Sequence, residues 1–451
     1  MPQAPHAPNA PQAANASIET RTIAKISGRI VPFLVLAFFI SFIDRVNVGF
    51  AALEMNRQLG FTATAFGWGV GAFFVSLCLF EVPANVLMAK VGARLWICRI
   101  MISWGLVSGA TAFVTGEKSF LALRFLLGVA EAGFFPGVIL YLGTWFPSQH
   151  RARVLSLFLM AMPLANFIGS PISGALLGLD GVLGLHGWQW LFLIEAVPAV
   201  VMGLLALVAL PDDPSRARWL SDEGREWLTA SLAEERRQPA RVEATSIWQV
   251  LRHPRVLGLA VIYAGSVGCN YALSYWQPQM IKSFGLSNFD TGLINAIPFG
   301  IASAVMILWA RRSDRRGERV WHTALPLMVS AAGLIACMFL NTLAPTVIAL
   351  TVALAGCYSV KAPMFALCAE SLSARTSAAG IGQVCAIGNI AGVLCPTLVG
   401  WIRDLTGNFR MGLLPMVVLA LIGTLVTLTL RRERPADIAP GFADGAARQA
   451  R

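Results

Sequence analysis

Charged residues are scarce in this chain. Asp, Glu, Lys and Arg together make up only 13% of the 451 residues, whereas 56% of the residues are hydrophobic. Soluble globular proteins carry about 25% charged residues, so this composition excludes an ordinary water-soluble domain. The apolar residues also gather in runs close to the ~20 residues that a helix needs to cross a bilayer. The chain is therefore predicted to be a polytopic membrane protein.

Metal-ligand and disulfide patterns are missing as well. The eight cysteines lie in or beside apolar runs with no Cys-x-x-Cys spacing, and the five histidines lie in the N-terminal tail or near the ends of apolar runs. The cysteines are most simply small buried apolar side chains. We therefore predict no cofactor, no metal site and no enzyme, and we expect carboxylates to carry any proton relay within the membrane.

Twelve apolar runs predict an all-α membrane protein with twelve transmembrane helices in two six-helix bundles. The runs cover residues 31–52, 65–89, 95–115, 120–146, 154–179, 188–210, 256–281, 290–310, 321–341, 344–369, 379–402 and 411–430. The predicted division is a disordered tail at 1–20, an N-terminal bundle at 21–210, a cytoplasmic linker at 211–255, a C-terminal bundle at 256–432 and a C-terminal tail at 433–451. The linker is expected to contain an amphipathic helix near 217–235, and the N-terminal tail does not have the pattern of a cleaved signal peptide.

The net charge is +11, and the basic residues that produce it lie in alternate loops rather than on one soluble face. Basic residues cluster at 21–29, 90–99, 151–153, 311–319 and 431–434, and the intervening loops carry few cations. The positive-inside rule then places both termini in the cytoplasm. Nucleic-acid binding is not expected.

The two halves of the chain resemble each other. Gly92 and Gly317 lie in similar basic strings, 225 residues apart, and Gly174 and Gly400 lie in similar Gly- and Pro-bearing strings, 226 residues apart. These nearly equal offsets indicate duplication of a six-helix unit. Two similar bundles could rock about a site at the midplane, with the glycines allowing close helix packing, or they could form a static bundle.

The first and the fourth apolar runs carry charged residues well inside them. The first run contains Asp44, Arg45 and Asn47, and the fourth contains Arg124 and Glu131, seven positions apart and so on one helix face. A charge at the centre of a membrane helix costs about 2.5–3.5 kcal/mol, so such residues are expected to face a partner or a water-filled path. The acids could carry protons while the arginines bind an anionic substrate, or Asp44–Arg45 and Arg124–Glu131 could be permanent ion pairs that fix helix packing.

The second half offers further polar residues within its apolar runs. Asn270 and Tyr271 are candidates for a cavity wall, whereas Trp276 could either line that wall or anchor the helix at the membrane interface. Lys361 could bind a second carboxylate, or it could snorkel or pair with a group at a helix end. The first half contains two further acids, Glu81 and Glu195, which are expected to have structural roles.

Three strings resemble the anion:cation symporter branch of the major facilitator superfamily. The strings are Ser41 to Ala51, Arg124 to Gly137, and Gly388 to Gly407. A fourth string, Leu185 to Glu195, is similar to permeases of the tartrate, phthalate and sugar-acid type. The resemblance covers roughly residues 21–432.

The resemblance implies import of a small organic carboxylate by proton symport, with alternating access, across the inner membrane of a bacterium. The implied proton-coupling acids are Asp44 and Glu131, and the candidate substrate-binding residues are Arg45, Asn47, Arg124, Asn270, Tyr271, Lys361 and Asn389. The loop motif of the family, associated with gating, falls on Gly92, Arg94, Asp314, Arg315 and Gly317. The expected partners are a small organic anion, protons and lipid, and the chain is expected to be a monomer. A proton-coupled exporter of organic anions or drugs, and a receptor that binds solute without moving it, are the alternatives.

Overall fold

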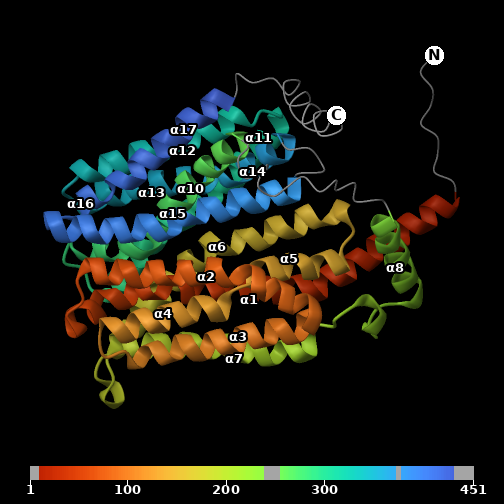
Figure 1. The fold of residues 1–451 in the computed structure, drawn as a ribbon, viewed down its shortest axis with the longest axis horizontal. Coiled ribbons are helices and arrows are strands. Elements are labelled where there is room, and N and C mark those ends of the chain that lie inside the picture. Colours follow the sequence, from red (N-terminus) through yellow and green to blue (C-terminus); the bar gives the residue numbers. More distant parts are fainter. Residues whose placement is uncertain (1–9, 238–253, 372–376, 431–451) are drawn as a thin grey trace, which may run out of the picture.

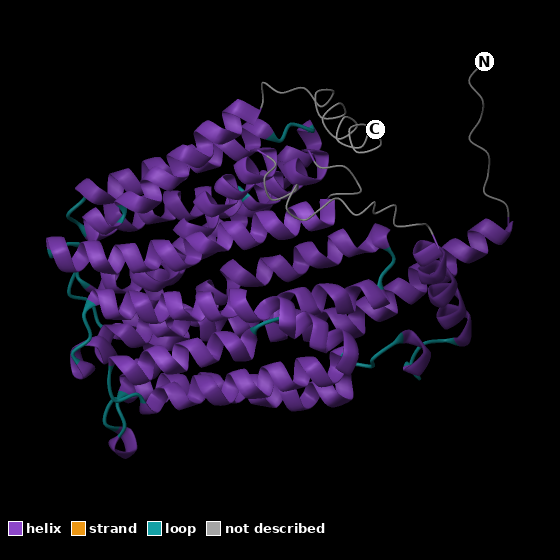
Figure 2. Cartoon of the chain, viewed as in Figure 1, coloured by secondary structure: helices purple, strands orange, loops and turns teal. Residues whose placement is uncertain are grey.

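The computed structural model describes residues 10–237, 254–371 and 377–430, and within these ranges the chain forms helices and loops without a strand (Figure 2). Twelve helical segments are long and apolar enough to cross a membrane. The twelve predicted spans are therefore confirmed, and the chain is an all-α multi-pass membrane protein.

The helices lie side by side, with the first half of the chain below the second half in the view of Figure 1. The first half contains α1 (Ala10–Leu59), α2 (Ala63–Val91), α3 (Ala93–Ala110), α4 (Glu117–Glu131), α5 (Phe134–Trp145), α6 (Ser148–Leu176) and α7 (Gly187–Ala209), followed by α8 (Asp222–Arg237). The second half contains α10 (Pro254–Lys282), α11 (Asn288–Arg316), α12 (Val320–Phe339), α13 (Leu343–Ser359), α14 (Lys361–Ser371), α15 (Ser377–Thr406), α16 (Phe409–Gly412) and α17 (Leu414–Leu430). We call the end of the molecule with the α1–α2 turn the loop end, and the end with α8 the linker end.

Two of the predicted spans are each broken into two helices. The fourth span is divided between α4 and α5 because Gly133 adopts a left-handed conformation with φ of +82°, and a Cβ there would lie 2.7 Å from the Cβ of Ala84. The tenth span is divided between α13 and α14 at Val360. Pro363 lacks an N–H and so cannot bond the carbonyl of Ser359. Both breaks fall next to a charged candidate, since α4 ends at Glu131 and α14 begins at Lys361.

The helix bounds differ from the predicted segments at two places. Helix α1 begins at Ala10, so residues 10–20, predicted as part of a disordered tail, are helical; alanine, which recurs in this stretch, has the highest helix propensity. The amphipathic linker helix begins at Asp222 rather than near residue 217 because Ser221 caps it, with the Ser221 hydroxyl accepting from Gly224 N at 3.3 Å.

The linker helix α8 packs against the first half of the chain. Glu235 accepts a hydrogen bond from Arg151 Nη1 at 2.8 Å, and the preceding Trp219 stacks on Trp145 with the ring centroids 5.7 Å apart. The guanidinium of Arg29 lies 5.5 Å from the centroid of the Trp219 ring, and Leu228 of α8 is fully buried. Helix α8 is thus attached to α1, α5 and α6.

The two halves are held together toward the loop end. Several hydrogen bonds between the halves lie near this end. Asp404 accepts from Ala63 N at 3.1 Å and Thr64 N at 2.7 Å, so that α15 caps the start of α2. Ser170 Oγ accepts from Asn295 Nδ2 at 2.9 Å between α6 and α11. The halves are therefore closed against each other at the loop end.

Glycines permit this close approach, as predicted for the fifth and eleventh spans. A Cβ at Gly174 of α6 would lie 2.7 Å from Asn288 O, and a Cβ at Gly400 of α15 would lie 2.2 Å from Ala63 O. Real Cβ atoms do not approach backbone oxygens so closely, so each position requires glycine for the halves to meet.

We expect Asp404→Ala to weaken closure at the loop end. The substitution removes an N-cap worth about 0.5–2 kcal/mol, so the open population should rise by about two- to thirtyfold. The measurement is the labelling rate of Ser170→Cys by a bulky maleimide in detergent, compared between wild-type and Asp404→Ala backgrounds, with the parent protein as control for native cysteines. An unchanged rate would show that Asp404 does not hold this end closed.

Candidate functional site

Two polar clusters surround the middle of α1, one on each side of the helix. Asp44, Arg45 and Asn47 are all buried, with exposed fractions of 2%, 9% and 0%. Neighbouring residues on a helix point about 100° apart, so Asp44 and Arg45 face different partners. The alternative of an Asp44–Arg45 ion pair is therefore not realised among the described residues.

The first cluster joins Arg45 to Glu131 and to the second half of the chain. Arg45 Nη2 donates to Glu131 Oε1, and Ser41 Oγ donates to the same oxygen at 2.8 Å. The other guanidinium nitrogen, Nη1, donates to the hydroxyl of Tyr271 on α10 at 3.2 Å. An ion pair buried in the first half thus reaches the boundary between the halves.

Arg124 lies next to this ion pair without joining it. Its Nε donates to Gly69 O at 3.4 Å, and its guanidinium lies 4.9 Å from the centroid of the Phe73 ring. Its Nη2 is buried with no hydrogen-bond partner in the part of the chain that the structure describes. Tyr275 interacts electrostatically with Arg124, and its hydroxyl also lacks a partner. The region between α4 and α10 therefore holds an unused cationic donor and an unused hydroxyl.

The alternative of an Arg124–Glu131 ion pair is not realised among the described residues. The two residues are on one face of α4, but seven residues of helix separate them by about 10 Å along the axis. Glu131 is instead paired with Arg45, 86 residues earlier in the chain. Helix periodicity thus placed Arg124 and Glu131 on one face of α4 but did not identify Arg45 as the partner of Glu131.

The second cluster surrounds Asp44. Its carboxylate accepts hydrogen bonds from Trp104 Nε1 and Ser108 Oγ of α3 and from Asn47 Nδ2, the last at 3.2 Å. Asp44 is therefore held by neutral donors and not by an arginine. The candidate Asn47 belongs to this cluster rather than to the one at the boundary between the halves.

The wall contributed by α10 is buried and polar. Asn270 is 2% exposed, and its Oδ1 has no hydrogen-bond partner within the described ranges. Trp276 is buried as well, and its Nε1 donates to Pro396 O at 3.0 Å while its ring lies against Phe66. Trp276 thus packs between helices and does not anchor α10 at a lipid interface.

Lys361 and Asn389 lie on other helices of the second half. Lys361 Nζ is 3.9 Å from Met162 Sδ of α6 and 4.6 Å from the centroid of the Tyr358 ring. No ion pair joins it to an acid in the described ranges. Asn389 is half-buried on α15. Lys361 thus reaches the first half from the second, as Tyr271 does.

The loop motif lies at the linker end, away from both clusters. Gly92 has φ of +96° and separates α2 from α3, and Arg94 Nε lies 3.5 Å from Asp212 Oδ2. In the second half, Gly317 ends α11 with φ of +63°, and Arg315 is exposed. The motif shapes tight turns between consecutive helices.

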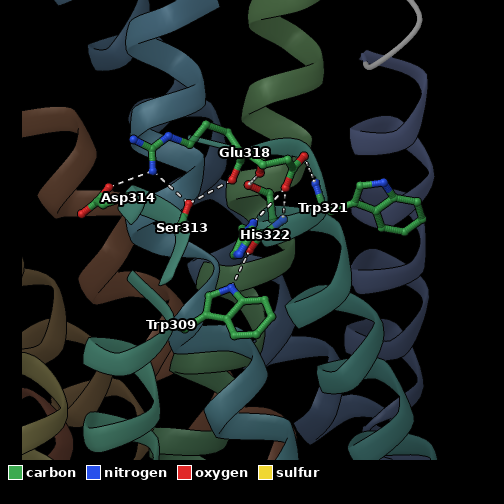
Figure 3. A network of polar contacts seen from close by, with 8 residues as sticks. Trp309, Ser313, Asp314, Glu318, Trp321 and His322 are labelled. Carbon is green, nitrogen blue, oxygen red and sulfur yellow. Dashed lines mark hydrogen bonds and ion pairs between the residues drawn. The ribbon is translucent and has the colours of Figure 1, made fainter. Parts of the chain in front are cut away.

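Figure 3 shows the polar network at the second copy of the motif. Arg319 Nη1 donates to Asp314 Oδ1 at 2.8 Å and to Ser313 Oγ at 2.9 Å. Glu318 accepts from Trp321 N at 2.7 Å and contacts His322 Nδ1 at 2.8 Å. Burial opposes ionisation of Glu318, but these donors outweigh it and lower the pKa of the carboxyl. The network fixes the start of α12.

Several site residues were missed from the sequence. Trp104 and Ser108 are four residues apart in the third span and therefore share a helix face, which was a usable signal. Ser41 lies one turn before Arg45 and could have been found in the same way. Tyr275 lies one helical turn after Tyr271 and could have been found from that spacing. Nothing in the sequence pattern indicates that Phe73 lies under Arg45 and Arg124.

Comparisons with known proteins identify the family and the fold of the chain. The family model for the Major Facilitator Superfamily matches residues 34–386. A protein of Agrobacterium vitis named "Putative tartrate transporter" is 50% identical over 422 residues, which cover 93% of this chain and 97% of that one. A "Quinolone resistance transporter" of Acinetobacter baumannii is 36% identical over 410 residues, covering 91% and 94%. The crystal structure of a bacterial homologue of the human lysosomal transporter Spinster superposes with a TM-score of 0.73 at 16% identity, covering 90% of this chain and 97% of that one.

Proposed function

Because the chain belongs to the Major Facilitator Superfamily and is thus a transporter and not an enzyme, we propose that it imports a small organic carboxylate by proton symport. Substrate and protons would reach the central clusters alternately from the two sides of the inner membrane of a bacterium, as the two bundles rock. Asp44 and Glu131 would be the proton-coupling acids.

The Arg45–Glu131 ion pair is the observation that carries this proposal. While Glu131 is ionised, it occupies one side of the Arg45 guanidinium. Protonation of Glu131 removes that charge and frees paired N–H donors for a substrate carboxylate. Proton binding and anion binding then favour each other, which is the thermodynamic requirement for symport.

The surroundings favour an anion with more than one polar group. Arg124 supplies a second guanidinium with an unused donor, and Asn270 and Tyr275 supply an amide oxygen and a hydroxyl without partners. Tyr271 already contacts Arg45 and would close the site from the second half. A sugar acid, dicarboxylate or aromatic acid fits this set of polar groups. Tartrate, for which one relative is named, is a dicarboxylate.

The orientation of the chain decides which side of the membrane the closed contact faces. Basic clusters at 21–29, 90–99, 151–153 and 311–319 lie at the linker end, which we assign to the cytoplasm. The loop end then faces outward, and the closed contact at Asp404 belongs to a conformation that excludes solute from that side.

Export is the second candidate. The relative named for quinolone resistance covers nearly the whole chain, and the same two clusters could drive an organic anion outward against an inward flow of protons. A non-transporting receptor is the third. The described part of the linker holds α8 and the short 3-10 helix Pro214–Arg216 and offers no large domain for signalling.

The test is uptake of radiolabelled tartrate into proteoliposomes with an imposed proton gradient. Symport predicts accumulation that a protonophore abolishes, and counterflow without a gradient would exclude a receptor. A thermal-shift screen of sugar acids, dicarboxylates and aromatic acids selects the substrate for the assay if tartrate gives no shift. Accumulation that is insensitive to the protonophore would refute proton coupling.

We expect Lys361→Met to weaken the binding of dicarboxylates more than the binding of monocarboxylates. If Lys361 holds the second carboxylate, loss of a charge-assisted hydrogen bond worth about 1.5–3 kcal/mol should raise the Kd of a dicarboxylate by ten- to a hundredfold. The measurement compares tartrate with a matched monocarboxylate by competition for uptake. Equal weakening of both would indicate that Lys361 has a structural role.

A further inference from the structure

Glu195 on α7 is a buried acid that the proposed transport cycle does not use. It is 6% exposed, and its Oε1 accepts a hydrogen bond from Ser173 Oγ of α6 at 2.8 Å. Its Oε2 is buried without a partner, and no ion pair joins Glu195 to a basic side chain within the described ranges. An ionised carboxylate in such a place would be strongly unfavourable, whereas a protonated one would supply a donor that needs an acceptor.

The side chain of Asn47 offers such an acceptor. Asn47 donates through Nδ2 to Asp44 Oδ1 at 3.2 Å, and the Asn47 side chain also interacts with Glu195. Asn47 Oδ1 is itself buried without a partner. An amide can donate to one carboxylate and accept from another carboxyl only when the second carries a proton. A proton on Glu195 would therefore give both partnerless oxygens, Asn47 Oδ1 and Glu195 Oε2, a hydrogen bond.

We propose that Asp44 and Glu195 share one proton, with the Asn47 amide switching between them. With the proton on Glu195 Oε2, the O–H donates to Asn47 Oδ1 and Asn47 Nδ2 donates to ionised Asp44. When the proton moves to Asp44, the amide turns over, so that Nδ2 donates to ionised Glu195 and Oδ1 accepts from Asp44. The pair holds one proton and one negative charge in both states.

The surroundings of the pair are consistent with this exchange. The other groups that contact the two acids, Trp104, Ser108 and Ser173, are neutral donors. The charged residues that act on Asp44 from a greater distance are Glu131 and Arg124 of α4. Occupation of the ion-pair cluster by protons or an anion would thus change which of the two acids holds the shared proton.

The two acids lie at different depths. Glu195 is eight residues from the start of α7 at the loop end, or about 12 Å, whereas Asp44 is fifteen residues from the end of α1, or about 22 Å. Glu195 is therefore the acid nearer the loop end. The shared proton would move inward from Glu195 to Asp44, toward the ion pair at Glu131. This direction of proton movement rests on the proposed function.

Infrared spectroscopy of the full-length protein tests the proton sharing without any substrate. At neutral pH the wild type should show a carbonyl band from a protonated carboxyl that disappears in Glu195→Gln. In Asn47→Leu the band should remain but shift in frequency, because the carboxyl has lost its amide partner. Glu54→Gln, which alters an acid outside the cluster, should leave the band unchanged. A spectrum that Glu195→Gln does not alter would overturn the proposal.

Transport separates this inference from the proposed function. Glu195→Gln should slow proton-driven uptake of tartrate by about tenfold or more while leaving exchange intact. Adding Asn47→Leu should slow it no further, since both substitutions break one relay. If Glu131→Gln abolishes accumulation but Glu195→Gln matches the wild type, the shared proton is refuted and symport stands. If Glu131→Gln also accumulates normally, proton coupling at Glu131 itself is refuted.

Discussion

Glu131→Gln is expected to abolish proton-driven accumulation of substrate while sparing exchange. With one coupled proton, a gradient of one pH unit supplies about 1.4 kcal/mol and can sustain a roughly tenfold concentration ratio. The introduced amide would accept the hydrogen bond from Ser41 but could not release a proton, and Arg45 would remain available to the substrate. The ratio should therefore fall to about one. The measurement is the steady-state accumulation of labelled substrate in proteoliposomes, beside exchange without a gradient.

A matched substitution controls for general damage. Glu54→Gln changes another acid on α1, one that accepts a hydrogen bond from Asn288 Nδ2 at 2.6 Å near the loop end and does not touch Arg45. It should leave the accumulation ratio close to that of the wild type. Equal loss of exchange and accumulation in Glu131→Gln would instead indicate that Glu131 only supports the fold around Arg45.

Arg124→Ala is expected to abolish the stabilisation of the protein by its substrate. Truncating one partner of a buried charge pair costs about 2–5 kcal/mol, so the Kd should rise by thirtyfold to several thousandfold. Stabilisation by ligand depends on the ratio of its concentration to Kd, so the thermal shift should disappear at concentrations that saturate the wild type. The empty protein should still fold, because Arg124 makes only one hydrogen bond in the described structure.

Arg124→Lys separates charge from geometry at the same position. Lysine retains a positive charge but lacks the planar fork of donors that pairs with a carboxylate, so its thermal shift should lie between those of the wild type and the alanine variant. An undiminished shift in Arg124→Ala would remove this residue from the substrate site.

The twelve spans could be predicted because each crossing requires about twenty apolar residues. The charged positions within them could also be found, since their burial is costly enough to require a purpose. The residues that these charged groups contact could not be predicted. Arg45 meets Tyr271 across 226 residues of sequence, and only the packing of α1 against α10 decides that contact.

The breaks in the fourth and tenth spans were not predicted for a similar reason. Gly133 was visible in the sequence, but a glycine in a membrane helix is more often a packing contact than a helix end. The close approach of Ala84 from α2, which leaves no room for a Cβ at Gly133, is a tertiary feature. Asp44 and Glu195 likewise lie on helices whose relative rotation no single-helix pattern reveals.

The attachment of α8 has a practical consequence. Glu235 and Trp219 tie α8 and the residues just before it to the N-terminal bundle, so this part of the linker belongs with that bundle in any rearrangement of the two halves. A fluorescent tag or an antibody fragment attached to α8 would then travel with the N-terminal bundle as a single body. Such a tag or fragment would enlarge the protein for imaging without being attached to the C-terminal bundle.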